Sequence, residues 1–200
     1  MLTKPKFKIC RRLGPGVYDK CQTPKFSASS GKFGPNTKRP KALSEFGAQL
    51  LEKQKIRFSY GINERQLSNY VKKATLTKGS GTADKFYEKL ESRLDNVVYR
   101  MGLGASRRAC RQMVSHGHFI VNDHKVTIPS FEVKVGDVIK IREGSKSKKL
   151  FEGIAEKLKE YNSPTWLQFD ASIMEGKILA KPTNTETFLD LNAVLEFYSR

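Results

Sequence analysis

Acidic residues are scarce in this sequence. Only 20 Asp and Glu residues stand against 37 Lys and Arg residues in a chain of 200, which leaves a net charge of +17 at pH 7. A surface with such an excess of one sign repels itself unless a polyanion neutralises it. The shortage of acids therefore favours nucleic acid as the partner, with the anionic face of a membrane as the alternative.

Long apolar runs are also missing. Crossing a membrane takes about 20 consecutive apolar residues, and the chain has neither such a run nor an amphipathic anchor for a membrane surface. Its first ten residues, MLTKPKFKIC, carry no signal-peptide core behind their charges. We therefore expect a cytoplasmic protein that binds no membrane.

Cysteine is rare, with single residues at positions 10, 21 and 110. An odd number of cysteines in a reducing compartment favours free thiols over a disulfide framework. A structural zinc site needs four protein ligands, and Cys10 and Cys21 have no further Cys or His before residue 110. We therefore expect neither a metal nor any other cofactor.

Catalytic motifs are absent as well. The chain has no phosphate-binding loop, no GxSxG and no HExxH, and Gly102-Leu103-Gly104 lacks the βαβ setting of a dinucleotide site. His116 and His118 have no Cys or carboxylate pattern to complete a metal site. Asp95 and Asp137 have no partner in sequence and are interpreted as helix or turn residues. The chain is not expected to be an enzyme.

Basic charge is concentrated at the N-terminus. The net charge is +10 for residues 1–41, +3 for residues 42–91, +4 for residues 92–143 and zero for residues 144–200. The first segment is rich in Gly, Pro, Ser and Thr, so it has few apolar side chains to offset its ordering entropy. We expect an extended basic arm that becomes ordered on its partner. A solvated tail without a role is the alternative.

Helical periodicity begins at Ser44. One amphipathic, basic helix is predicted from there to near Gly61. Asn63 and Gln66 then form a variant of the capping box, which predicts a second helix that ends near Gly79. Apolar residues at helical spacing from Phe86 to Met101 predict a third helix of about four turns.

A fourth helix is predicted between Ser106, as its N-cap, and Gly117. Its apolar residues fall on one half of the helical wheel, and Arg107, Arg108 and Arg111 fall on the other. Guanidinium groups on adjacent turns suit the repeating phosphates of a nucleic-acid backbone. A solvated helix face is the alternative, but no acid lies between Asp95 and Asp123 to balance these cations.

Short alternating runs follow this helix. HFIVN, KVTI, FEVKV and DVIKIR are separated by turn signals, and they predict a small, mostly antiparallel sheet. Helical spacing resumes from Leu150 to Tyr161. The remainder mixes short extended pieces with an apolar end, LDLNAVLEFYSR.

Several long stretches resemble the bacterial-type ribosomal protein S4 family in order and spacing. They are SEFGAQLLEKQKIRFSYGINERQLSNYVKKA, LESRLDNVVYRMGLGASRRACRQMVSHGHFIVN, SPTWLQFD and MEGKI. Two departures stand out. Some members have an N-terminal zinc site with four Cys, and this chain looks like the metal-free branch. Asn122-Asp123-His124 stands where the family usually has Asn-Gly, which puts the turn and its RNA contact in doubt.

The resemblance implies an α+β fold in four parts. These are a basic arm (1–42), a helical domain in two pieces (43–91 and 144–200) and, inserted between them, an S4 RNA-binding module of two helices on a small sheet (92–143). It also implies a primary binder of small-subunit 16S-type rRNA that nucleates assembly of the 5′ domain. With protein S5, such a protein contributes to translational accuracy and to the path by which messenger RNA enters.

The implied location is the small subunit of a cytoplasmic ribosome, with an organellar ribosome as the alternative. An RNA-modifying enzyme that carries the same module would need a catalytic domain, and a free stress-related RNA-binding protein would be shorter. The residues expected to contact RNA are Lys8, Arg11, Arg12, Lys38, Arg39, Lys41, Lys53, Lys55, Arg57, Arg65, Arg93, Arg107, Arg108, Arg111, His116 and Lys125. Across the junction of arm and helical domain, phosphates are predicted to be held without base reading by Lys38, Arg39, Lys41, Lys53, Lys55 and Arg57.

Overall fold

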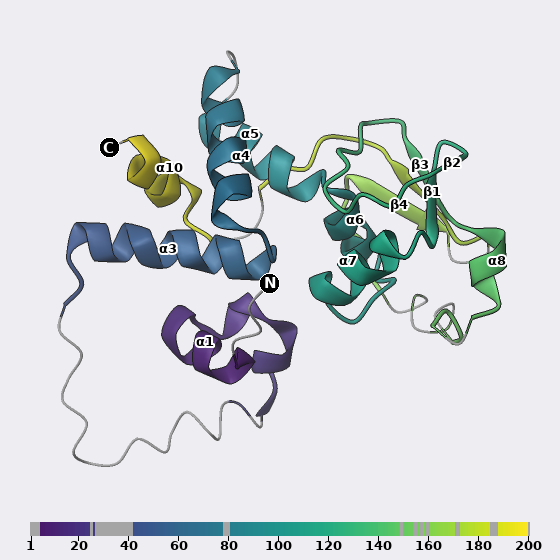
Figure 1. The fold of residues 1–200 in the computed structure, drawn as a ribbon, viewed down its shortest axis with the longest axis horizontal. Helices are drawn as coiled ribbons and strands as arrows, with labels where there is room; N and C mark the ends of the chain where they lie inside the picture. The colour runs from purple at the N-terminus through teal and green to yellow at the C-terminus, as the bar shows by residue number, and fades with distance from the viewer. Residues whose placement is uncertain are drawn as a thin grey trace. The chain divides into compact units, whose positions relative to one another are not determined.

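The computed structural model describes residues 5–24, 26, 42–77, 81–148, 150–153, 156, 158, 161–170, 173–184 and 188–199. They belong to two compact units, which are Met1–Lys78 with Thr185–Arg200, and Gly79–Asn184 (Figure 1). The second unit is larger than the module expected at residues 92–143, because it begins at Gly79 and residues after 143, such as Phe151, Trp166 and Ile178, join its core. No described helix is long and apolar enough to cross a membrane.

Two helices of the first unit begin where the sequence predicts. The α3 helix (Glu45–Ser59) is capped by Ser44, whose hydroxyl accepts a hydrogen bond from the Gly47 amide at 3.2 Å. The α4 helix (Glu64–Leu76) opens with a complete capping box, in which Asn63 Oδ1 accepts from the Gln66 amide at 2.8 Å. Because a cap of this kind contributes about 1 kcal/mol, it defines where each helix starts. Both predicted helices are confirmed.

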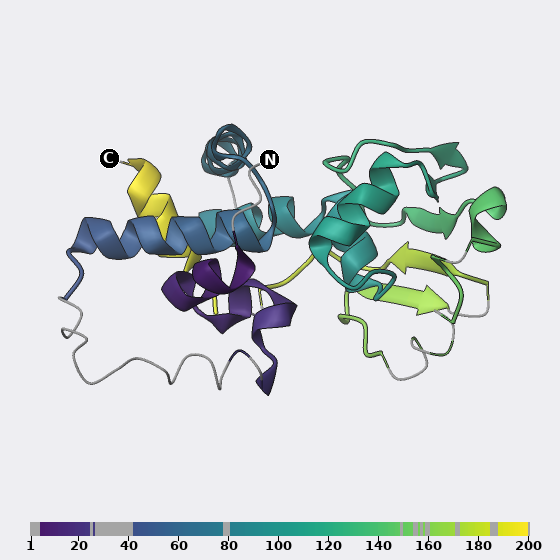
Figure 2. The same ribbon diagram turned by 60° about the horizontal axis from the view of Figure 1, so that its bottom comes forward.

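The C-terminal helix α10 (Leu191–Ser199) completes this unit by packing against α3 (Figure 2). Asp190 begins it by accepting a hydrogen bond from the Ala193 amide at 3.0 Å. Leu191 and Val194 are buried, so the apolar end of the chain contributes to the core of the first unit.

Residues near the N-terminus fold into a small module, which the sequence did not predict. It contains α1 (Lys6–Leu13) and two 3₁₀ turns, η1 (Pro15–Val17) and η2 (Asp19–Cys21). Its buried cluster consists of Ile9, Cys10, Leu13, Val17, Cys21 and Phe26, with Leu51, Phe58 and Phe188 packed against it. The apolar residues of this segment are few but lie close together, so this part of the arm has a core of its own.

Cys10 and Cys21 form a disulfide within this module, and both are buried. The prediction of free thiols was therefore wrong for this pair. It was right for Cys110, whose thiol forms no disulfide and is buried in the second unit. The pairing follows from the approach of α1 and η2 in space, which spacing along the chain does not reveal.

The helix predicted from residues 86 to 101 is two helices, and this prediction was wrong. The α5 helix (Thr82–Glu91) ends before Ser92, and α6 (Leu94–Arg100) begins after Arg93. Arg93 has extended backbone angles (φ −69°, ψ 134°), so the chain changes direction there.

The cause of the break is a distant loop. The first amides of α6 donate to loop carbonyls, Leu94 N to Phe131 O at 2.9 Å and Asp95 N to Pro129 O at 3.1 Å. These bonds satisfy backbone donors that a helix start leaves unpaired. A helical pattern within residues 86–101 contains no sign of these partners.

The second unit contains one antiparallel sheet of five strands in the order β2-β1-β3-β5-β4. The strands are β1 (Phe119–Val121), β2 (His124–Lys125), β3 (Val138–Ile141), β4 (Leu167–Asp170) and β5 (Glu175–Ile178), with a short helix α8 (Glu143–Lys146) after β3. The α+β fold class with a small antiparallel sheet is confirmed. The run FEVKV is not a strand, because only an isolated bridge between Arg93 and Glu132 forms there.

The α6 helix and α7 (Arg107–Ser115) cover one face of this sheet (Figure 1). Their apolar side chains form one core with strand residues such as Phe119, Ile139 and Ile141. Strands β4 and β5 extend the sheet beyond the expected module. Of the helix predicted at residues 150–161, the structure describes residues 150–153, 156, 158 and 161, and the other five lie outside the described residues.

Candidate nucleic-acid interface

The α7 helix separates its apolar and basic faces as predicted. Ser106 caps it by accepting a hydrogen bond from the Ala109 amide at 3.3 Å, and Cys110, Met113 and Val114 are buried. The apolar side is fixed by a close approach at Gly104, where a Cβ atom would lie 2.5 Å from Cys110 Sγ. The predicted cap and the predicted buried face are confirmed.

Two buried carboxylates lie beneath the basic face. The first is Glu91 at the end of α5, which is fully buried. Arg100 donates to it from Nε at 2.8 Å and from Nη2 at 2.9 Å, and Arg107 Nη2 lies 3.9 Å from Oε1. Buried carboxylates are stable only when they are paired in this way.

The second carboxylate is Asp95, near the start of α6. Arg93 donates to it from Nε at 3.0 Å and from Nη2 at 2.7 Å, and Arg111 Nη1 lies 4.0 Å from Oδ2. Asp95 therefore has partners, and its interpretation as a helix residue without one was incomplete. The side chain of Arg93 is only 2% exposed, so the structure does not present this predicted RNA contact to solvent.

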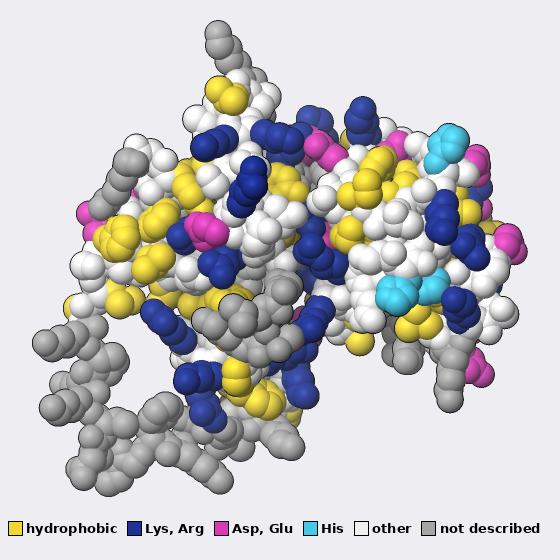
Figure 3. Space-filling model, in the orientation of Figure 1, with side chains coloured by type: hydrophobic (Ala, Val, Ile, Leu, Met, Phe, Trp, Pro, Cys, Tyr) yellow, Lys and Arg dark blue, Asp and Glu magenta, His cyan; other side chains and the backbone are white. Residues whose placement is uncertain are grey.

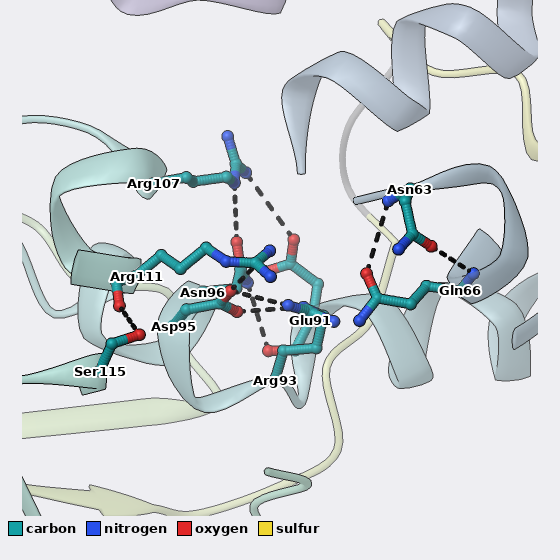
Figure 4. A network of polar contacts seen from close by, with 9 residues as sticks. All are labelled: Asn63, Gln66, Glu91, Arg93, Asp95, Asn96, Arg107, Arg111 and Ser115. Carbon is teal, nitrogen blue, oxygen red and sulfur yellow. Dashed lines mark hydrogen bonds and ion pairs between the residues drawn. The ribbon is translucent and has the colours of Figure 1, made fainter. Parts of the chain in front are cut away.

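Two neutral side chains of α6, Asn96 and Tyr99, complete the network, and Figure 4 shows Asn96 among its charged neighbours. Asn96 Oδ1 accepts a hydrogen bond from Arg107 Nε at 2.7 Å, and Asn96 Nδ2 donates to the backbone oxygen of Glu91 at 3.2 Å. The guanidinium of Arg107 also lies 4.5 Å from the ring centroid of Tyr99. We call the set Glu91, Arg93, Asp95, Asn96, Tyr99, Arg100, Arg107 and Arg111 the arginine cluster. With four arginines and two carboxylates, it keeps a net positive charge.

His116 and His118 follow α7, and the structure separates their roles. His116 is exposed and its ring stacks on that of His118, with centroids 6.1 Å apart. His118 is buried, and its Nδ1 lies 2.9 Å from Ser145 Oγ. Burial lowers the pKa of His118, and the positive charges of Lys148, His116 and Arg142 lower it further. A neutral His118 belongs to the core, whereas His116 is available for contact.

The departure at Asn122 and Asp123 does not abolish the tight turn between β1 and β2. Both residues adopt positive φ, 46° and 65°. Asn122 Oδ1 accepts a hydrogen bond from the Val138 amide at 3.0 Å, and its Nδ2 donates to Asp137 Oδ1 at 2.8 Å. Asn and Asp tolerate this conformation better than other residues with side chains. The turn places Lys125, which is exposed, on β2.

The basic residues of α3 are engaged within the first unit. Lys53 is buried and donates to Glu64 at 2.9 Å, while Arg57 donates to the same carboxylate at 3.2 Å. Lys55 pairs with Glu52 at 2.6 Å. The ammonium of Lys53 also lies 4.2 Å from the ring centroid of Phe197. Lys53 and Arg57 link α3 to α4, Lys53 also contacts α10, and Lys55 pairs within α3, although all three were predicted to contact RNA.

Glu64 is the centre of this second set of ion pairs. Burial alone would raise its pKa, but hydrogen bonds from Lys53, Tyr198 and Arg57 lower the pKa overall. Tyr198 donates to Glu64 at 2.7 Å. Burial and this hydrogen bond raise the pKa of Tyr198 well above its usual range.

Four other predicted residues are exposed on helices of the first unit. Lys8, Arg11 and Arg12 lie on α1, and Arg65 lies on α4. Figure 3 shows dark blue Lys and Arg side chains gathered around α1. Lys38, Arg39 and Lys41 fall outside the described residues.

Five members of the cluster were missed by sequence reasoning, and one of them, Asp95, was interpreted as a helix or turn residue without a partner. Only Arg100 and Tyr99 could have been identified from the sequence as RNA contacts, because they lie on the predicted third helix and have side chains that suit RNA. Glu91 and Asn96 gave none, since an acid and an amide in a helix are usually surface residues. Within the described ranges, no group of three or more His, Cys, Asp or Glu residues is placed to hold a metal ion.

The excess of basic residues and the arginines on one face of α7 are the arrangement expected of a basic RNA-binding protein. Two family models match the chain, "Ribosomal protein S4/S9 N-terminal domain" over residues 1–91 and "S4 domain" over residues 92–139. Proteins named small ribosomal subunit protein uS4 are similar along nearly their whole length. That of Acetivibrio thermocellus is 44% identical, covering 96% of this chain and 96% of its own.

The corresponding protein of Chromobacterium violaceum is 43% identical over 98% of this chain and 97% of its own. That of Desulforamulus reducens is 40% identical over 99% and 98%. The chain therefore belongs to the uS4 family of small ribosomal subunit proteins. It is a structural, non-enzymatic component of the cytoplasmic ribosome.

Proposed function

We propose that the protein is a primary binder of small-subunit rRNA that nucleates assembly of the 5′ domain. The arginine cluster carries this proposal, together with the exposed Arg108 beside it. A surface that needed only solubility would not bury two carboxylates beneath four arginines. Membership of the uS4 family supplies the RNA class. Residues 92–143 are proposed as the minimal RNA-binding module within the second unit.

The proposed interface is narrower than the set of basic residues in the sequence. In the second unit it comprises Arg100, Arg107, Arg108, Arg111, His116 and Lys125. In the first unit it comprises Lys8, Arg11, Arg12 and Arg65, all exposed. Lys38, Arg39 and Lys41 are proposed to approach the incoming messenger RNA, as the family resemblance implies.

Contacts of this kind go to phosphates, so they position RNA without reading its bases. Recognition then depends on the shape of the folded RNA, whose backbone must present phosphates where the guanidinium groups lie. This explains how a protein without base-reading motifs can select one region of rRNA.

A patch on α3 and α10 suits a protein neighbour instead. Phe46 is exposed, and its ring lies 5.4 Å from that of Phe197. At its edge Gln49 donates both to Glu45 at 3.2 Å and to Glu196 at 3.1 Å. Apolar rings beside two carboxylates fit a partner with apolar and basic residues. We propose that protein S5 binds here and that the pair contributes to translational accuracy.

Salt dependence of binding to a 16S-type rRNA fragment tests the RNA proposal. Removing one cation that binds a phosphate should lower the slope of log K against log salt by about 1. Arg107→Ala, Arg108→Ala and Arg111→Ala should each show this decrease. The matched control is Lys177→Ala, which removes an exposed cation on β5 outside the proposed interface. Equal slopes for all four variants and the wild type would contradict the proposal.

A further inference from the structure

The arginine cluster contains a feature that RNA binding alone does not require. Its two carboxylates, Glu91 and Asp95, are buried in a unit whose partner is a polyanion. A negative charge near an RNA-binding surface repels phosphates, and burying it costs solvation. We therefore expect the two buried carboxylates to have a role at this surface that cations alone cannot fill.

The two carboxylates connect elements that are separate in sequence. Glu91 ends α5, and it holds Arg100 at the end of α6 and Arg107 at the start of α7. Asp95 in the first turn of α6 reaches Arg93 and Arg111. Each carboxylate therefore binds one guanidinium by two hydrogen bonds and attracts a second one, on α7, at 3.9 or 4.0 Å, so their separations follow from the fold.

Fixed separations affect selectivity. A free arginine side chain samples many rotamers and can meet a phosphate in almost any RNA. A guanidinium held by bidentate hydrogen bonds has lost most of that freedom before RNA arrives. Such a guanidinium binds strongly to an RNA whose phosphates match its position. It adds little binding free energy for an RNA whose phosphates do not.

We propose that Glu91 and Asp95 are positioning residues that set the spacing of Arg100, Arg107 and Arg111 and thereby make the interface selective for folded rRNA. The inference rests on the proposed rRNA-binding function. Asn96 and Tyr99 act with them, since they fix the Nε edge and the plane of the Arg107 guanidinium. The carboxylates themselves do not touch RNA.

The sign of one mutational effect separates this role from simple electrostatics. Glu91→Gln removes a negative charge, so electrostatics alone predicts tighter binding to every RNA. Positioning predicts weaker binding to the cognate rRNA, because Arg100 and Arg107 lose their anchor. Binding to non-cognate RNA should stay the same or tighten.

The experiment compares two RNAs with the full-length protein at one salt concentration. One RNA is a folded fragment of the 16S-type 5′ domain, and the other is unstructured poly(U). For Glu91→Gln, the preference for the folded fragment should fall by about tenfold, the size expected when one well-placed arginine no longer meets its phosphate. The matched control is Glu88→Gln on the same helix, which removes an acid paired with Lys181 at 3.1 Å and should leave the preference unchanged.

A second variant covers the case in which Glu91→Gln does not fold. Tyr99→Leu leaves every charge in place and removes only the ring beside Arg107, so it should lower the preference by a few fold with an unchanged circular dichroism spectrum. Displacement of the Arg100 and Arg107 Nε–Hε NMR resonances from their wild-type positions should accompany the change. A purely structural role would lower the melting temperature without changing the preference.

The outcomes are distinguishable. If folded Glu91→Gln or Tyr99→Leu keeps the wild-type preference, Glu91 and the ring of Tyr99 do not position the arginines and the inference is overturned. If the wild-type protein itself shows no preference for the folded fragment, the proposed function fails instead.

Discussion

Two helices each carry three basic residues that look alike in the sequence, and the structure uses them differently. In α3, Lys53, Lys55 and Arg57 pair with carboxylates that link this helix to its neighbours or lie on it. In α7, Arg107 and Arg111 rest on carboxylates buried beneath them, and Arg108 is exposed. The acidic partners of the α3 cations lie on α3 or α4, whereas those of the α7 cations lie beneath the face that we propose to meet RNA.

Lys53 and Arg111 differ in how far their side chains are enclosed, whereas Arg57 of α3 (33% exposed) and Arg107 of α7 (19% exposed) do not follow this difference. The Lys53 ammonium lies between Glu64 and the ring of Phe197, and its side chain is 9% exposed. The Arg111 side chain is 35% exposed although it lies near Asp95. A compact ammonium that contacts one carboxylate and one ring has little surface left for a phosphate. A planar guanidinium has five donors around its edge, so it can bind a carboxylate and a phosphate together.

A third basic set, on α1, depends on a covalent link, and breaking it should give the largest effect on stability. Replacing Cys10 and Cys21 with Ser removes a cross-link that closes a loop of 11 residues, which should cost the N-terminal module about 3 kcal/mol. Urea denaturation followed by far-ultraviolet circular dichroism measures the destabilisation. Oxidised wild type with and without reductant provides the control, and equal stability in both would show that the link is not formed in solution.

Breaking the α3 set should have the next largest effect. Lys53→Met leaves Glu64 with one cation fewer next to apolar rings, and the free energy of unfolding should fall by about 1–2 kcal/mol, less than for a fully buried pair because Glu64 is partly exposed. The slope of rRNA binding against salt should not change. If the salt slope of rRNA binding falls and the stability is unchanged, Lys53 contacts RNA as the sequence predicted.

Sequence patterns predicted the features that depend on neighbours along the chain. The capping box at Asn63 and Gln66, the Ser106 cap and the two faces of α7 are all set within one or two helical turns, and they are confirmed. The break at Arg93 depends on a loop about 40 residues away. The α5 and α6 residues have continuous helical spacing, so no local pattern could show the break between them.

The residues of the candidate site also divide into those that a local pattern predicts and those that depend on contacts between elements. The exposed Arg108 could be predicted from the helical wheel, because only its own helix decides its direction. The burial of Lys53 and Arg93 and the role of Glu91 depend on contacts between elements, and charge counting treats all of these residues alike. A disulfide between α1 and η2 is hidden from sequence for the same reason.

The α3 set should also be the more sensitive of the two to acid. The pKa of Glu64 is lowered in the folded protein, so this group stabilises the fold above its ordinary value of 4.5 and loses that contribution as pH falls through the folded pKa. Because Glu64 is partly exposed, the effect should stay below about 1 kcal/mol. Acid unfolding of Glu64→Gln should start from lower stability at pH 7 and depend less on pH below 4.5. Parallel acid curves for the two proteins would contradict this assignment.

The smallest expected change in rRNA affinity tests how Arg107 and Arg108, both on α7, differ from each other. Arg108 is exposed, so as a point charge near a phosphate it should be replaceable by lysine, and Arg108→Lys should bind rRNA within about twofold of wild type. Arg107 donates from Nε to Asn96 and lies over the ring of Tyr99. Lysine has no planar edge to make both contacts, so Arg107→Lys should weaken binding by about fivefold at the same net charge. Fluorescence anisotropy with a labelled rRNA fragment measures both variants under one condition. If they lose affinity equally, the network under Arg107 serves the fold alone, and the two arginines differ only in exposure.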